Sequence, residues 1–162
     1  MVSKTTFKIR LDALADPDDL RELSSSDKDA IKQEIAEFAI DKILEDVSKS
    51  KSPVDNSKFK ALNKDYKKEK SKIAMPVPNL ELHGDMLDAL SSEPYRAGVE
   101  VGIFDYDQAQ KSDNHNKFSA KSKRTKVPQR QFIPKKGEQL RPGIMRQLKT
   151  VARQMIEELK DE

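Results

Sequence analysis

The sequence contains no cysteine, and its 162 residues include only five glycines. Without cysteine the chain can form neither a disulfide bond nor a thiolate nucleophile. The glycines are scattered, so no glycine-rich phosphate-binding loop is present. These absences exclude disulfide-stapled, thiol-dependent and P-loop proteins, and they are compatible with a reducing compartment.

Long apolar runs are also missing. No segment approaches the roughly 18–20 apolar residues that span a bilayer, and Met1 to Leu11 has no signal-peptide core. We therefore expect a soluble protein without membrane contact. Its length suits one domain, residues 1–162. Hydrophobic residues make up 35% and charged residues 36%, against roughly 45–50% and 25% in average globular proteins. This imbalance predicts a small core with solvated arms, or surfaces that are covered only in an assembly.

Charge is distributed unevenly along the chain. Residues 12–47 hold twelve acidic and four basic residues, whereas residues 117–136 hold eight basic residues and no acidic one. This separation of acidic and basic segments indicates what the protein binds and does not indicate its fold. Three interpretations remain open: the acidic segment faces the basic segment of another copy, the basic segment faces nucleic acid, or both are solvated faces.

Hydrophobic periodicity predicts an α+β fold with a small, mostly antiparallel sheet and two long helices. Alternating apolar residues predict strands over 7–11 and 99–103. The helices are expected at about 26–48, with a capping box of Ser26 and Asp29, and at about 141–160. A short helical turn is expected after Asp16-Pro17, a brief helix over 107–114, and a further extended segment over 129–134 that adds a strand. Residues 50–79 and 117–128 are predicted to be extended or mobile, with a basic loop or arm at 117–128.

The helix over 26–48 has two apolar faces, which require two partners. One partner is the chain's own sheet. The other is either a neighbouring subunit or a second element of the same chain. We take the first alternative as the hypothesis, with a candidate subunit interface formed by Ile31, Ile35, Phe38, Ile40, Ile43 and Val47. The final helix has a single clean stripe, typical of packing on a sheet: Ile144, Leu148, Val151, Met155 and Leu159.

The segment from Ser52 to Leu90 resembles a docking segment, because a few apolar anchors lie within a lysine-rich and partly irregular path. Its anchors are Phe59, Leu62 and Tyr66. Pro76 and Pro78 prevent a helix or a central strand from continuing through it.

The sequence contains only weak evidence for a catalytic site or a metal site. Glu81, His83 and Asp85 alternate as metal ligands on a strand would, but Gly84 interrupts them and polar surface is the simpler interpretation. His115 is a possible general base without an obvious nucleophile, so a loop-anchoring hydrogen bond is the better interpretation. We expect no catalytic residues, no metal and no cofactor.

The basic run is the more substantial candidate. Its side chains can neutralise phosphates or contact an acidic protein partner, and the sequence does not choose between the two. The candidate DNA or acidic-partner contacts are Lys121, Lys123, Arg124, Lys126 and Arg130.

Several segments, in order, resemble one protein family. They are SPVDNSKFKALNKDYKKEK, PNLELHGDMLDAL, VEVGIF, the DNHN turn, PQRQFIP and the closing amphipathic helix, between about Ser52 and Glu158. The set is similar to the virion-morphogenesis, neck and tail-completion proteins of tailed bacteriophages.

This resemblance implies a structural protein rather than an enzyme. It implies a cyclic homo-oligomer in the neck or at the top of the tail, made in the host cytoplasm and incorporated in the virion. The implied partners are portal, connector or adaptor proteins on one side and tail terminator or tail tube proteins on the other. DNA would pass through the lumen of the ring. The alternative is a non-specific nucleic-acid-binding accessory protein.

Overall fold

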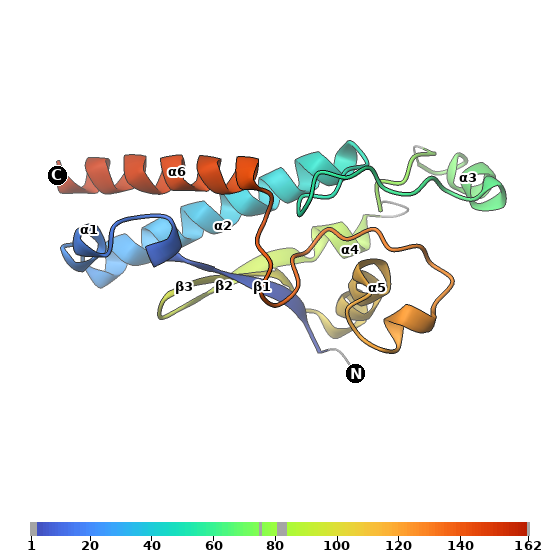
Figure 1. The fold of residues 1–162 in the computed structure, drawn as a ribbon, viewed down its shortest axis with the longest axis horizontal. Coiled ribbons are helices and arrows are strands. Elements are labelled where there is room, and N and C mark those ends of the chain that lie inside the picture. Colours follow the sequence, from blue (N-terminus) through green and yellow to red (C-terminus); the bar gives the residue numbers. More distant parts are fainter. Residues whose placement is uncertain (1–2, 75, 81–83, 162) are drawn as a thin grey trace.

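The fold is an α+β arrangement, as the sequence predicts, and the molecule is elongated (Figure 1). The computed structural model describes residues 3–74, 76–80 and 84–161. The elements, in chain order, are β1 (Thr5–Arg10), the 3-10 helix η1 (Leu11–Ala13), α1 (Pro17–Arg21), α2 (Ser25–Ser48), α3 (Lys64–Lys70), α4 (Asp85–Asp88), β2 (Leu90–Tyr95), β3 (Gly98–Ile103), α5 (Tyr106–Asn116), the 3-10 helix η2 (Ser122–Arg124) and α6 (Pro142–Lys160).

The sheet has three antiparallel strands in the order β1-β3-β2. Val101 of the central strand pairs with Phe7 on one side and with Ser92 on the other. The period-2 patterns of β1 and β3 predict these two strands correctly, whereas the polar strand β2 has no such pattern. Gly102 has φ +148, and a Cβ there would lie 2.2 Å from the carbonyl oxygen of Thr5. Glycine is therefore required at this close approach of β1 and β3.

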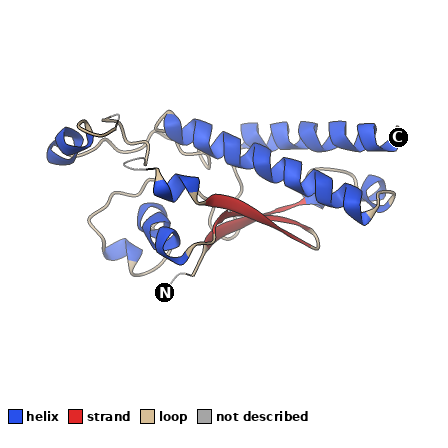
Figure 2. Cartoon of the chain, turned by 180° about the vertical axis from the view of Figure 1, so that it is seen from behind, coloured by secondary structure: helices blue, strands red, loops and turns tan. Residues whose placement is uncertain are grey.

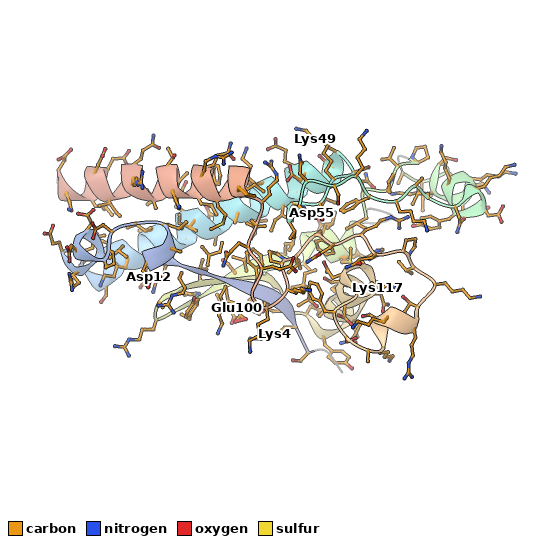
Figure 3. All side chains as sticks on the ribbon, viewed as in Figure 1. Lys4, Asp12, Lys49, Asp55, Glu100 and Lys117 are labelled. Carbon is orange, nitrogen blue, oxygen red and sulfur yellow. The ribbon has the colours of Figure 1, made fainter. Side chains whose placement is uncertain are left out.

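The outer face of the sheet is polar. Lys4 and Glu100 point toward one another across it, with 2.7 Å between Nζ and Oε2 (Figure 3). Burial alone would raise the pKa of Glu100, but hydrogen bonds from Lys4 and Thr6 outweigh it, so the pKa of this carboxyl lies below its usual value. One face of the sheet is thus left for the core.

Helix α2 lies between that face of the sheet and α6 (Figure 2). Its C-terminal part packs alongside the start of α6, and α6 contributes four buried residues to the contact: Ile144, Leu148, Ala152 and Ile156. Of the five stripe residues expected on α6, Ile144 and Leu148 are buried, whereas Val151, Met155 and Leu159 are only partly buried. The helix packs mainly on α2 and not on the sheet that its stripe had suggested. The core consists of the sheet, α2 and α6 in three layers.

The expected subunit interface on α2 is wrong for four of its six residues. Ile31, Ile35, Ile43 and Val47 are each 0% exposed within the single chain. Phe38 and Ile40 are partly buried against the same core. The physical reason is that α6 covers the second apolar face of α2, so the helix is enclosed within one chain and has no need of a neighbouring subunit.

The helix starts follow capping chemistry. Asp16 accepts a hydrogen bond from Asp18 N at 2.8 Å, with Pro17 at the first helical position, as predicted for α1. Helix α2 begins earlier than expected, because Ser24 Oγ accepts from Asp27 N at 3.1 Å. The capping box assigned to Ser26 and Asp29 is therefore wrong by two residues.

A bidentate ion pair joins the end of α2 to the start of α6. Arg141 donates from Nε to Asp46 Oδ2 at 2.8 Å and from Nη2 to Oδ1 at 3.2 Å. The hydrogen bond to Asp46 raises the pKa of Arg141. Asp46 is only 4% exposed, so its carboxylate depends on this partner.

We expect the change Arg141→Met to lower the free energy of unfolding by about 2 kcal/mol, because it leaves a buried carboxylate without its cation. Urea denaturation measures this loss. The matched control is Arg146→Met, further along the exposed side of α6, which should change stability by less than about 0.5 kcal/mol. Equal losses in the two variants would contradict a specific role for the ion pair.

Residues 129–134 do not form the predicted strand. Instead, Asn116 at the end of α5 accepts hydrogen bonds at Oδ1 from Phe132 N (2.9 Å) and Ile133 N (3.1 Å). A buried side chain thus takes the place of a neighbouring strand.

The basic loop is organised by hydrogen bonds and is not an irregular arm. Asp113, 3% exposed, accepts from the backbone N–H and the hydroxyl of Ser119. Lys117 donates from Nζ to the carbonyl oxygens of Ser122 (2.8 Å) and Thr125 (3.1 Å), around the turn of η2. The loop is therefore folded back onto α5.

Candidate functional site

The two ends of the elongated molecule carry opposite charge. We define the acidic end as residues 16–22 and 157–161, which hold seven acidic and two basic residues. The basic end is defined as residues 64–72 and 117–126, which hold ten basic and two acidic residues. Helix α1 and the end of α6 lie at one extremity of the fold, and α3 and the loop with η2 lie at the other (Figure 1). A single chain cannot bring these two ends together.

A groove of about 770 Å³ opens at the basic end. One wall is formed by residues 60–63 and α3, and the other by α5 and residues 126–130. Leu80 and Met86 contribute apolar surface, and Tyr66, 40% exposed, lies in the first wall. Three exposed lysines line the groove, namely Lys60, Lys111 and Lys126. The combination of apolar lining and positive charge suits an acidic ligand that also has an apolar part.

Arg130 is a structural residue of this groove and not the exposed phosphate contact that the sequence predicts. It is 7% exposed, and its guanidinium donates to the carbonyl oxygens of Lys60 (2.9 Å) and Ala61 (3.3 Å). Burial lowers the pKa of Arg130. The guanidinium holds the two walls together, which explains why it turns inward.

The other four members of the basic run are exposed: Lys121, Lys123, Arg124 and Lys126. They do not line one continuous hollow. Lys126 lines the groove, whereas Lys123 lines a separate cavity of about 740 Å³ together with Lys117, Lys135 and Lys136. The basic run of the sequence therefore contributes lysines to two separate surfaces, the groove and the second cavity.

His115 lines the groove but is not arranged as a general base. The pKa of its imidazole is lowered to about 4, first by burial and then by the charges of Arg130 and Lys117. Its Nδ1 is buried and has no hydrogen-bond partner among the described residues. Ser119 donates its hydroxyl to Asp113 rather than to His115. The anchoring bond at this position is made by the backbone, since Arg130 N donates to His115 O at 2.8 Å.

The candidate metal ligands Glu81 and His83 lie outside the described residues. Within the described part of the chain, no cluster of three or more histidine, aspartate or glutamate side chains is arranged to hold a metal ion. In the same part, no helix is long and apolar enough to cross a bilayer.

The expected docking segment, Ser52 to Leu90, divides between core and groove. Phe59 is buried at 8% exposure, whereas Tyr66 is exposed in the groove wall. Sequence reasoning missed Lys60 and Lys111 as groove residues. The lysine-rich composition around Tyr66 signals the first of them, but nothing in the sequence places Lys111 opposite.

Comparison of the chain with protein-family models, with curated protein sequences and with solved structures gives no match.

Proposed function

We propose that this protein is a structural virion protein of a tailed bacteriophage, forming a ring in the neck or at the top of the tail that joins the head connector to the tail. The virion role follows from the family resemblance of the sequence, and the observation in the structure that supports a ring is the opposite charge of the two ends of one elongated chain. Head-to-tail contact between such ends is heterologous, and heterologous contacts generate closed rings when the rotation between subunits closes.

A further observation supports the proposal. Two segments of the family resemblance, DNHN and PQRQFIP, are joined in the fold, because Asn116 Oδ1 accepts hydrogen bonds from Phe132 N and Ile133 N. DNHN forms the end of α5 rather than a turn.

Removal of the protein from the infected cell tests this function. We expect complete heads and complete tails that remain unjoined, visible by electron microscopy, and joining should be restored when purified protein is added to the mixture. Joined, infectious particles assembled without the protein would overturn the proposal.

The second candidate is a non-specific nucleic-acid-binding accessory protein, favoured by the exposed Lys121, Lys123 and Arg124 and the neighbouring cationic cavity. It predicts that duplex DNA binding weakens steeply with salt. It also predicts that replacing Lys121, Lys123 and Arg124, none of which lines the groove, with glutamine abolishes function. Under the ring proposal that variant still joins heads to tails.

A further inference from the structure

The groove at the basic end has a surface that the fold itself does not explain. Tyr66 is one of three large hydrophobic side chains that are markedly exposed in the described part of the chain, with Ile73 and Tyr106. Leu80, on the same groove, has φ +63, a backbone conformation that costs an L-residue roughly 1–2 kcal/mol. Apolar exposure and strained backbone together indicate a surface adapted for a ligand.

The charges of the groove restrict that ligand. Lys60, Lys111 and Lys126 are exposed on its walls, and among the described residues Asp85 is the single carboxylate that lines it. A negatively charged ligand gains from the three lysines, and an apolar side chain on it gains from contact with Tyr66. A bare phosphate backbone satisfies the first requirement but leaves the apolar lining uncovered. An acidic protein segment that carries an apolar residue satisfies both.

The chain itself has such a segment. At the acidic end, Leu20 of α1 and Leu159 of α6 are partly buried among exposed carboxylates. The carboxylates that end α6 are Glu157, Glu158 and Asp161. Acidic residues are unfavourable at the C-terminus of a helix, where the macrodipole is negative. Their presence there does not stabilise α6, so a contact outside the chain accounts for them better.

We propose that the groove binds the acidic end of a second copy of this chain, with the last turn of α6 and α1 entering between α3 and α5. This inference rests on the proposed ring and identifies the two surfaces through which its subunits meet. The acidic end and the groove lie at opposite extremities of one chain (Figure 1), so the contact forms between copies and repeats from one copy to the next.

Site-directed cross-linking tests the contact, because a chain without cysteine provides a clean background. Purified Lys126→Cys protein is mixed with purified Glu158→Cys protein and treated with a short bismaleimide. We expect a covalent dimer that joins the two introduced thiols, identified by mass spectrometry. The control mixture pairs Lys126→Cys with Lys149→Cys, which is exposed near the middle of α6. A yield no higher than this control would overturn the inference.

A charge-reversal experiment provides the second readout. The variant Lys111→Glu/Lys126→Glu reverses the groove, and Glu158→Lys/Asp161→Lys reverses the acidic end; all four side chains are exposed. Each variant should weaken self-association at least about tenfold, measured by analytical ultracentrifugation. A protein that carries all four changes should recover it, because each reversed surface again meets its opposite. Failure to recover, with unchanged circular dichroism, would contradict the proposal.

The groove inference and the proposed function can fail separately. If groove reversal weakens DNA binding but leaves self-association unchanged, the groove is a nucleic-acid surface and the inference is wrong. If neither cross-link nor charge recovery is seen while particles without the protein stay unjoined, the groove inference fails and the proposed function stands. If the protein with all four charge reversals regains self-association, but particles assembled without the protein are joined, the contact between copies stands and the proposed function fails.

Discussion

Replacing Asn116 with alanine is expected to lower the free energy of unfolding by about 3–4 kcal/mol. Asn116 is 0% exposed and makes four side-chain hydrogen bonds. Its amide nitrogen donates to Ser112, and its oxygen accepts from the backbone N–H groups of Phe132 and Ile133, both also 0% exposed. Alanine leaves these two buried donors without partners, at roughly 1–3 kcal/mol each. Urea denaturation followed by circular dichroism measures the change.

The control for this prediction is Asn114→Ala, two residues earlier on the same helix and only partly buried. Its expected effect is within about 0.5 kcal/mol, because it removes no buried partner. A loss of less than about 1 kcal/mol for the Asn116 variant would mean that residues 129–134 are held by apolar packing alone.

Acidification from pH 7 to pH 4 is expected to destabilise the protein by up to about 3 kcal/mol through His115. The pKa of His115 is about 4 in the folded chain, against 6.5 for a free histidine. Between these values the unfolded chain binds a proton that the folded chain does not. The free energy of unfolding therefore falls as the pH falls through this window. Carboxylates such as Glu100, whose pKa is also lowered, lose their contribution only below their unfolded value near 4.5.

The variant His115→Gln should remove most of this pH dependence, measured as the difference in urea midpoint between pH 7 and pH 5. The chain has only two histidines, so His83→Gln is the matched control and should retain it. A nuclear magnetic resonance titration of the imidazole checks the assignment directly. A His115 pKa near 6.5 in the folded protein would contradict its burial between Arg130 and Lys117.

Local patterns predicted the elements that depend on short-range chemistry. The stripe through Ile144 and Leu148 placed α6 to within a residue, because one apolar face repeats regularly along a helix. Alternation around Phe7 and Val101 placed β1 and β3. Asp16 with Pro17 predicted the start of α1, since a cap and its first turn are adjacent in the chain.

The candidate sites were less predictable, because they depend on groups far apart in the chain. Arg130 belongs to a basic run in sequence, but its guanidinium reaches the carbonyl oxygens of Lys60 and Ala61, about seventy residues earlier. Lys111 lines the same groove as residues 60–63 only because α5 forms the opposite wall. The composition of the neighbouring sequence does not predict the position of either side chain.

The sequence by itself determined the α+β class, most helix and strand positions, and the segregation of acidic and basic residues along the chain, because each of these follows from neighbouring residues. Only the tertiary structure decided what covers the second apolar face of α2. Two apolar faces require two partners, but burial by α6 and burial by another subunit satisfy the same hydrophobic requirement. Ile31 and Ile43 are fully buried within the single chain, where α2 packs against both the sheet and α6, which leaves opposite charges at the two ends of the molecule to carry the proposed contact between copies.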